Sequence, residues 1–182
     1  MEKPVWQHLK PKLMYKLAVF PGSFDPITIG HYSIINRALP LFDKIIIAIG
    51  YNREKNGFFP IEDRIKWINK LFINHPSIEV QSYTGLTVDF CKKVNAHYLI
   101  RGLRTSADFE FERSVAQVNR KLQTDLETIF LLTEPQHSFI SSSIVREIIS
   151  HGGDPAEFLP PGLDISDLTS KSNSPDNNST SK

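Results

Sequence analysis

Cysteine, net charge and long apolar runs are the features that this 182-residue sequence has least of. A single cysteine, Cys91, excludes an internal disulfide and is typical of a reducing compartment. Lys and Arg number 21 against 20 Asp and Glu, so no excess of positive charge points to nucleic acid or an acidic membrane surface. No apolar run approaches the ~18 residues of a membrane span. We therefore expect a cytoplasmic protein with no nucleic-acid or membrane partner, in which a local basic cluster holds any bound anion.

The two ends of the chain also lack what a folded core needs. Lys and Pro interrupt residues 1–13, which argues against a signal peptide and indicates a short N-terminal extension. Residues 164–182 are rich in Ser, Thr and Asn and have no apolar face, so we expect a disordered tail. The predicted domain is residues 14–163, long enough for one domain with a substantial core.

Between these ends, short β-branched runs alternate with segments of helical spacing. The strand-like runs are 16–20, 44–50, 77–82, 97–102 and 127–133. The helical segments are 30–40, 60–76, 86–95, 106–122 and 141–153. Ser106 is the expected N-cap of the fourth helix, and a serine is expected to cap the fifth. This alternation predicts an α/β fold with a doubly wound, five-stranded parallel sheet, whose ligands bind at the carboxyl ends of the strands.

Residues able to bind a ligand or take part in catalysis gather where a predicted strand passes into a helix. These segments hold a histidine, cations and hydroxyls, namely Ser23, Thr28, His31, Arg53, Lys55, Arg101, Arg104 and Ser141 to Ser143. Taken singly, most have a simple structural explanation, such as a helix cap or a solvated charge. The RGLR segment at 101–104 is harder to explain, because two guanidiniums so close would repel each other without an anion between them. Together, these residues predict a pocket for several phosphates, such as a triphosphate and a second phosphorylated substrate.

The sequence lacks the motifs of several classes of enzyme. It has neither the GxxxxGK[ST] motif of a P-loop enzyme nor the GxGxxG motif of a dinucleotide fold. No serine has the nucleophile-elbow pattern, no paired carboxylates are expected at the strand ends, and Cys91 is expected to pack in a helix. What remains is direct transfer, in which a phosphate oxygen of one substrate attacks a nucleotide phosphate. A histidine at a helix N-terminus would stabilise that transition state.

Three segments resemble known motifs. FPGSFDPITIGH at 20–31 resembles the (T/H)xGH signature of the nucleotidyltransferase superfamily, in the form found in phosphopantetheine adenylyltransferases. IRGLRTSADFEFE at 100–112 and FISSSIVREI at 139–148 resemble two further blocks of that family, in its order and spacing. The resemblance covers about Lys16 to Pro161 and implies a Rossmann-like nucleotidyltransferase fold. It also implies adenylyl transfer from ATP to 4′-phosphopantetheine, which gives dephospho-coenzyme A and pyrophosphate in coenzyme A biosynthesis, with Mg²⁺ required.

By position, the resemblance assigns roles to individual residues. His31 would stabilise the transition state, and the phosphopantetheine ligands would be Ser23, Lys55, Thr87 and Arg101. The ATP ligands would be Ser23, Phe24, His31, Gly102, Leu103, Arg104, Glu112, His137, Ser138, Phe139, Ile140, Ser141, Ser142 and Ser143. No metal ligand is assigned, because no acidic cage is visible and Mg²⁺ usually binds through substrate phosphates. The family further implies a homohexamer and feedback by coenzyme A.

Four positions depart from the family pattern. Ser23 replaces a commoner threonine, Thr87 an apolar residue, His137 a tryptophan and Phe111 a tyrosine, which changes the lining of the pocket rather than the reaction. Asp25 and Asp108 recur in the motifs and are interpreted as structural. Three alternatives stay open: a relative that adenylylates nicotinate mononucleotide or transfers cytidylyl groups, a nucleotide-binding module without activity, and an electron carrier of the flavodoxin type.

Overall fold

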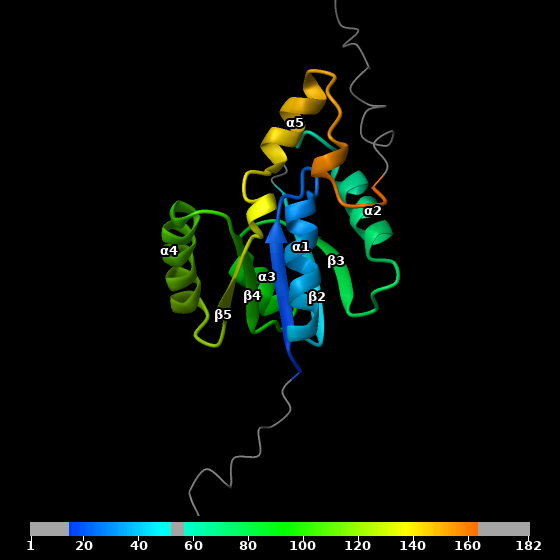
Figure 1. Ribbon diagram of the computed structural model, residues 1–182. Coiled ribbons are helices and arrows are strands. Elements are labelled where there is room, and N and C mark those ends of the chain that lie inside the picture. Colours follow the sequence, from blue (N-terminus) through cyan, green and yellow to red (C-terminus); the bar gives the residue numbers. More distant parts are fainter. Residues whose placement is uncertain (1–14, 52–56, 164–182) are drawn as a thin grey trace, which may run out of the picture.

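Five apolar runs form the strands of one parallel sheet (Figure 1). The strands are β1 (Leu17–Gly22), β2 (Lys44–Gly50), β3 (Ile78–Tyr83), β4 (Tyr98–Leu103) and β5 (Glu127–Leu132). Their spatial order is β3-β2-β1-β4-β5, and every pairing is parallel. This computed structural model describes residues 15–51 and 57–163. The predicted N-terminal extension, the predicted tail, Arg53 and Lys55 lie outside the described residues.

Helices cover both faces of this sheet, which confirms the predicted doubly wound α/β fold. They are α1 (Ile29–Ala38), α2 (Ile61–Leu71), α3 (Thr87–Lys93), α4 (Ser106–Leu122) and α5 (Ser142–Ser150), with short 3₁₀ turns at Leu39–Leu41, Pro135–His137 and Ala156–Phe158. Successive strand residues point to opposite faces. Phe20 and Ile100 therefore join the core under α1, α2 and α5, whereas Val19 and Leu99 join a second core with residues of α3.

The winding direction of the sheet reverses between β1 and β4. From β1 the chain adds β2 and then β3 on one side, and it returns to place β4 and β5 on the other side. The segments that leave β1 and β4 therefore separate at their carboxyl ends, where open α/β sheets bind ligands. Figure 1 shows α5 above the arrowhead of β1, so this helix also lies at that edge.

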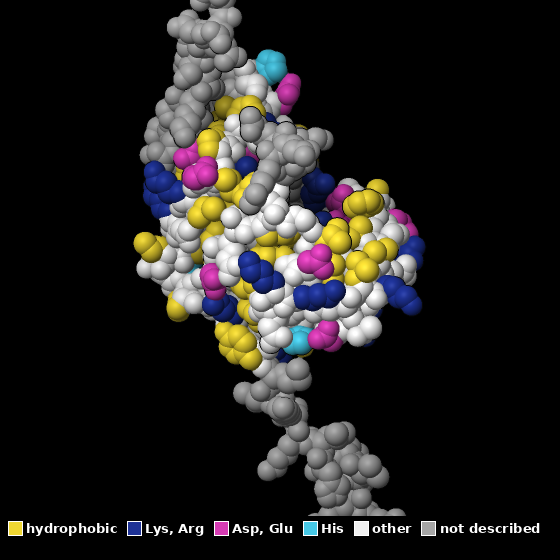
Figure 2. Space-filling view, turned by 180° about the vertical axis from the view of Figure 1, so that it is seen from behind, with side chains coloured by type: hydrophobic (Ala, Val, Ile, Leu, Met, Phe, Trp, Pro, Cys, Tyr) yellow, Lys and Arg dark blue, Asp and Glu magenta, His cyan; other side chains and the backbone are white. Residues whose placement is uncertain are grey.

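The helix α4 differs from the others in its packing. It has no buried residue, and it exposes Phe111 and Val118. Figure 2 shows apolar side chains gathered over this part of the surface, on the right of the view. The predicted cap Ser106 is wrong, because Thr105 holds the N-cap position. The Thr105 hydroxyl accepts from the backbone N–H of Asp108, and the Asp108 carboxylate accepts from that of Thr105, a reciprocal pair that fixes the helix start.

No helix within residues 15–51 and 57–163 combines the length and the apolar character needed to cross a bilayer.

Candidate active site

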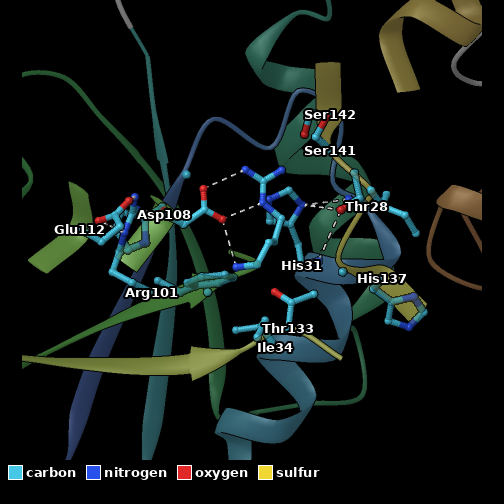
Figure 3. Close-up of a pocket in the computed structure, with 17 residues that line it drawn as sticks. Thr28, His31, Ile34, Arg101, Asp108, Glu112, Thr133, His137, Ser141 and Ser142 are labelled. Carbon is cyan, nitrogen blue, oxygen red and sulfur yellow. Dashed lines mark hydrogen bonds and ion pairs between the residues drawn. The ribbon is translucent and has the colours of Figure 1, made fainter. Parts of the chain in front are cut away.

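A pocket of about 260 Å³ lies at the carboxyl ends of β1 and β4 (Figure 3). Its walls come from the starts of α1, α4 and α5, which the topology brings to one edge of the sheet. The polar side chains that line it are Thr28, His31, Arg101, Arg104, Asp108, Glu112, Thr133, His137, Ser141 and Ser142. Cations, hydroxyls and a helix N-terminus thus surround one cavity, which is the donor set that a polyphosphate needs.

His31 is held by the residue that caps its own helix. Thr28 is the N-cap of α1, and its backbone N–H donates to Nδ1 of His31 at 3.1 Å. The Thr28 hydroxyl lies 2.9 Å from the same nitrogen, and it also accepts from the backbone N–H of His31. Because Nδ1 accepts the backbone hydrogen bond, the proton of the neutral ring lies on Nε2. The imidazole therefore has a fixed orientation and a defined tautomer.

The charge of His31 is fixed as well. Burial, reinforced by the guanidiniums of Arg104 and Arg101, lowers the pKa of His31 to about 4. The ring of Phe24, which is buried, packs edge-on against the imidazole at 5.2 Å between centroids. His31 is therefore neutral at pH 7 and offers one N–H donor from Nε2.

Each arginine of the RGLR segment is bound to a carboxylate of α4. Arg101 donates to Glu112 through Nη2 and, at 2.8 Å, through Nε. Arg104 pairs with Asp108 at 3.2 Å between Nε and Oδ2. The expectation that these guanidiniums need an anion between them is therefore wrong, because each has its own carboxylate. The expectation that no paired carboxylates lie at this edge is also wrong, since Asp108 and Glu112 lie one helical turn apart and both line the pocket.

Arg101 keeps part of its hydrogen-bonding capacity for a ligand. A guanidinium has five N–H groups. Two of them donate to Glu112, and one Nη1 proton donates to the carbonyl of Pro21 at 3.2 Å. Among the described residues, no acceptor is bonded to the remaining two N–H groups, one on each terminal nitrogen, so both can donate to a phosphate. Glu112 and Pro21 therefore orient Arg101 without using all of its N–H donors.

A second, smaller pocket of about 90 Å³ adjoins the first. Pro21, Arg101 and Glu112 line both pockets, so this group stands at their junction. The other lining residues are mostly apolar or neutral: Thr87, Leu99, Val115, Ala116, Asn119 and Thr128. The hydroxyl of Thr87 lies 2.7 Å from that of Tyr83, so the polar group that replaces an apolar one has a partner within the protein.

The residues predicted from sequence divide into three sets. The larger pocket contains His31, Arg101, Gly102, Arg104, Glu112, His137, Ile140, Ser141 and Ser142, and the smaller contains Thr87. Those that line neither of these pockets are Ser23, Phe24, Leu103, Ser138, Phe139 and Ser143. Lys55 lies outside the described residues.

Sequence reasoning missed several lining residues. The interpretation of Asp108 as structural agrees with its bond to the N-cap Thr105, but Asp108 also lines the larger pocket. Its spacing of four from Glu112 was the signal that could have placed both carboxylates on one helix face. Thr133 follows β5 without any local signal of its own. Asp25 accepts hydrogen bonds from the backbone N–H groups of Phe58 and Phe59, in agreement with its structural interpretation.

The carboxylates of the pocket do not form a metal cage. Asp108 and Glu112 are each bonded to an arginine. In the described part of the chain, no group of three His, Cys, Asp or Glu side chains is placed to hold an ion. These residues therefore do not fit a Mg²⁺ ion held by the protein alone. They are compatible with an ion that enters bound to a triphosphate, as part of the substrate.

Comparisons with known proteins agree with this geometry. Residues 19–148 match the family described as Cytidylyltransferase-like. The phosphopantetheine adenylyltransferase of Flavobacterium psychrophilum is 55% identical over 148 residues, which cover 81% of this chain and 97% of that protein. A protein from Bacteroides thetaiotaomicron with the same name is 50% identical over 148 residues, with the same shares covered.

One solved structure extends the comparison to the fold. The putative nicotinate-nucleotide adenylyltransferase from Vibrio parahaemolyticus superposes with a TM-score of 0.66 at 16% identity, over 87% of this chain and 94% of that one. A likeness at this low identity shows the fold alone, whereas the matched family and the sequence identities show common descent. The chain belongs to the cytidylyltransferase-like family and, within it, to the phosphopantetheine adenylyltransferases.

Proposed function

We propose that this pocket transfers the adenylyl group of ATP to 4′-phosphopantetheine, giving dephospho-coenzyme A and pyrophosphate. A phosphate oxygen of the acceptor attacks the α-phosphorus of ATP, and the bond from that phosphorus to the oxygen bridging to the β-phosphate breaks. Pyrophosphate leaves with the electron pair of the broken bond. The attacking phosphate is ionised at neutral pH, so the step needs no general base.

The observation that carries this proposal is a neutral His31, fixed by Thr28, beside two arginines. In the transition state, negative charge is spread over the oxygens of the transferred phosphorus. A donor that is already oriented stabilises that charge without reorganisation. The Nε2–H of His31 is such a donor, because Nδ1 accepts from Thr28 and the neutral ring keeps its one N–H proton on Nε2.

The two adjoining pockets match the two substrates. The larger, polar pocket is the proposed ATP site, and the predicted ATP ligands that line it are His31, Gly102, Arg104, Glu112, His137, Ile140, Ser141 and Ser142. The smaller pocket takes the pantetheine arm, with Thr87 in its wall. The acceptor phosphate binds the remaining N–H groups of Arg101 at the junction, and the family resemblance adds Ser23 and Lys55 as its ligands. This arrangement supports an in-line approach, because the acceptor phosphate and the α-phosphate then lie on opposite sides of the junction between the two pockets.

The remaining roles follow the family resemblance. Mg²⁺ enters with the triphosphate, and coenzyme A, which contains the same pantetheine arm, is a feedback ligand. The protein acts in the cytoplasm as a homohexamer. Self-association is supported by α4, which exposes Phe111, Val118 and Leu122. Sedimentation equilibrium tests this point: a mass of six chains is expected, and a monomer at all concentrations would contradict it.

Pyrophosphate release from ATP tests the reaction. The assay compares 4′-phosphopantetheine, nicotinate mononucleotide and no acceptor under otherwise identical conditions. Release with 4′-phosphopantetheine alone is the expected result. Release with nicotinate mononucleotide alone would favour the relative that uses that acceptor, and no release with any acceptor would favour a binding module without activity.

A further inference from the structure

Two side chains of α5 bind the segment that connects β1 to α1. The hydroxyl of Ser142 donates to the carbonyl of Pro26 at 2.8 Å. One turn later, Nη1 of Arg146 donates to the carbonyl of Asp25 at 2.6 Å. We call Ser142 and Arg146 the α5 latch. Both contacts join segments that are more than a hundred positions apart in the sequence, at separations of 116 and 121 residues.

The contact with Pro26 limits what the Ser142 side chain can do. A carbonyl oxygen has no proton to give, so the single hydroxyl proton of Ser142 points at Pro26 and cannot donate to a phosphate at the same time. Ser141 differs, because its oxygen accepts from the backbone N–H of Ile144 and its proton has no acceptor among residues 15–51 and 57–163. The oxygen of Ser143 accepts from Nη2 of Arg146, and its proton likewise has no acceptor in the described part of the chain.

The segment bound by the latch is the one that places His31. Thr28, two residues after Pro26, holds Nδ1 of the imidazole. Arg64, which is 5% exposed, donates to the carbonyl of Ser23 at 2.9 Å. The backbone before His31 is therefore anchored from α2 at one point and from α5 at two.

We propose that Ser142 and Arg146 are positioning residues, which set the start of α5 relative to His31, and that the Ser142 side chain does not bind ATP. This inference rests on the proposed function. The backbone N–H groups at the start of α5 and the Ser141 hydroxyl remain available to the phosphates. The latch determines how the bound triphosphate lies against the Nε2–H of His31, so its loss reduces turnover and leaves ATP affinity almost unchanged.

The first test is Ser142→Ala, with Ser150→Ala at the exposed end of the same helix as the matched control. A misplacement of about 1 Å can cost up to ~10²-fold in rate, so we expect kcat to fall by about tenfold or more while KM for ATP stays within about twofold. The control should change neither value. A rise in KM with kcat unchanged would make Ser142 a phosphate ligand and overturn the inference, as would no change in either.

The second test combines Ser142→Ala with Arg146→Ala. If the two residues act as one unit, the double variant should lose no more than about twofold beyond the worse single variant, because effects of coupled residues are non-additive. Independent, multiplicative losses in kcat would overturn the inference. Arg120→Ala, an exposed arginine of α4, is the control for removing a cation, and Arg146→Gln replaces Arg146→Ala if the latter does not fold.

A third measurement needs no catalysis. The NMR signals of the His31 ring, recorded without substrate, should shift in Ser142→Ala and stay unchanged in Ser150→Ala. Unshifted His31 signals in Ser142→Ala would contradict the latch even if the adenylyl transfer is established. Conversely, if no acceptor supports pyrophosphate release, the proposed function fails, while this signal still decides whether the latch positions His31.

Discussion

The two sides of the pocket are built in different ways. The side of α1 and α5 packs tightly, with Ile35 and Val145 fully buried, and its functional groups are the uncharged His31 and serine hydroxyls. The side of α4 has no buried residue in that helix, and its functional groups are charged. There, Arg101 pairs with Glu112 and Arg104 with Asp108.

This difference follows from the free-energy cost of burying a neutral group compared with a charged one. A neutral imidazole can be enclosed by apolar side chains, and enclosure fixes its position to the accuracy that transition-state stabilisation needs. An enclosed charge requires a partner and is costly if that partner is lost. Paired charges near solvent, on a helix that contributes little to the core, can bind phosphates without that cost. The buried side is therefore expected to control stability and turnover, and the α4 side to control binding.

The largest expected effect concerns stability. Ile35 of α1 is fully buried in the core. Its replacement by Ala should lower the free energy of unfolding by about 2–5 kcal/mol. Arg113→Ala on α4, at an exposed side chain that pairs with Glu110, should change it by no more than about 0.5 kcal/mol. Urea unfolding at one fixed protein concentration measures both, and similar losses would remove the contrast between the two sides.

The next effect concerns turnover. His31→Ala should lower kcat by about 10²–10³-fold, the usual cost of losing one oriented donor to a transition state. ATP binding, measured by calorimetry, should weaken only a few-fold. His31→Gln is the informative companion, because its side-chain amide can still donate and should recover part of the rate. Equal losses in kcat and in ATP affinity would instead make His31 a ground-state ligand.

Much of this architecture could be predicted from the sequence, because it depends on local patterns. β-branched runs such as 44–50 identify buried strands, and their alternation with helices fixes which loops meet at one edge. The same pattern predicts that His31, Arg101 and Ser141 share one pocket. It also predicts Thr28 at this edge, but not that Thr28 fixes the His31 tautomer.

The partners of these side chains could not be predicted in the same way. The pairing of Arg101 with Glu112 depends on how α4 is rotated against β4, and the helix has no buried residue that would fix this rotation. Thr105 and Ser106 were both able to cap α4, and only the reciprocal bond from Asp108 decides between them. The hydrogen bond from Ser142 to Pro26 joins segments that are distant in the sequence, so no local pattern predicts it.

A smaller effect is expected on the α4 side, in substrate binding. Arg101→Ala should raise KM for 4′-phosphopantetheine by about 10–100-fold, because charged hydrogen bonds of about 1.5–3 kcal/mol are lost. Glu112→Gln keeps one acceptor oxygen for Arg101 and should raise the same constant only a few-fold. Arg113→Ala, which removes an exposed pair with Glu110, is the control for charge. If Arg101→Ala leaves this KM unchanged, Arg101 does not bind the acceptor.

The smallest expected effect is the pH response of His31 in the neutral range. The pKa of this ring in the folded protein is about 4, against an ordinary value of 6.5 for histidine. In NMR titrations without substrate, its signals should therefore stay almost constant from about pH 8 to about pH 5.5 and move at lower pH.

The same shift sets the sign of the stability change. The unfolded chain takes up the His31 proton first, so the stability from the neutral ring is complete above pH 6.5 and is lost as the pH falls toward 4. His31→Gln should flatten unfolding free energy against pH within that window. A titration midpoint near 6.5 would mean that water solvates the imidazole of His31 as fully as it solvates Arg101 and Arg104. The α1 and α5 side of the pocket would then be as polar an environment as the α4 side.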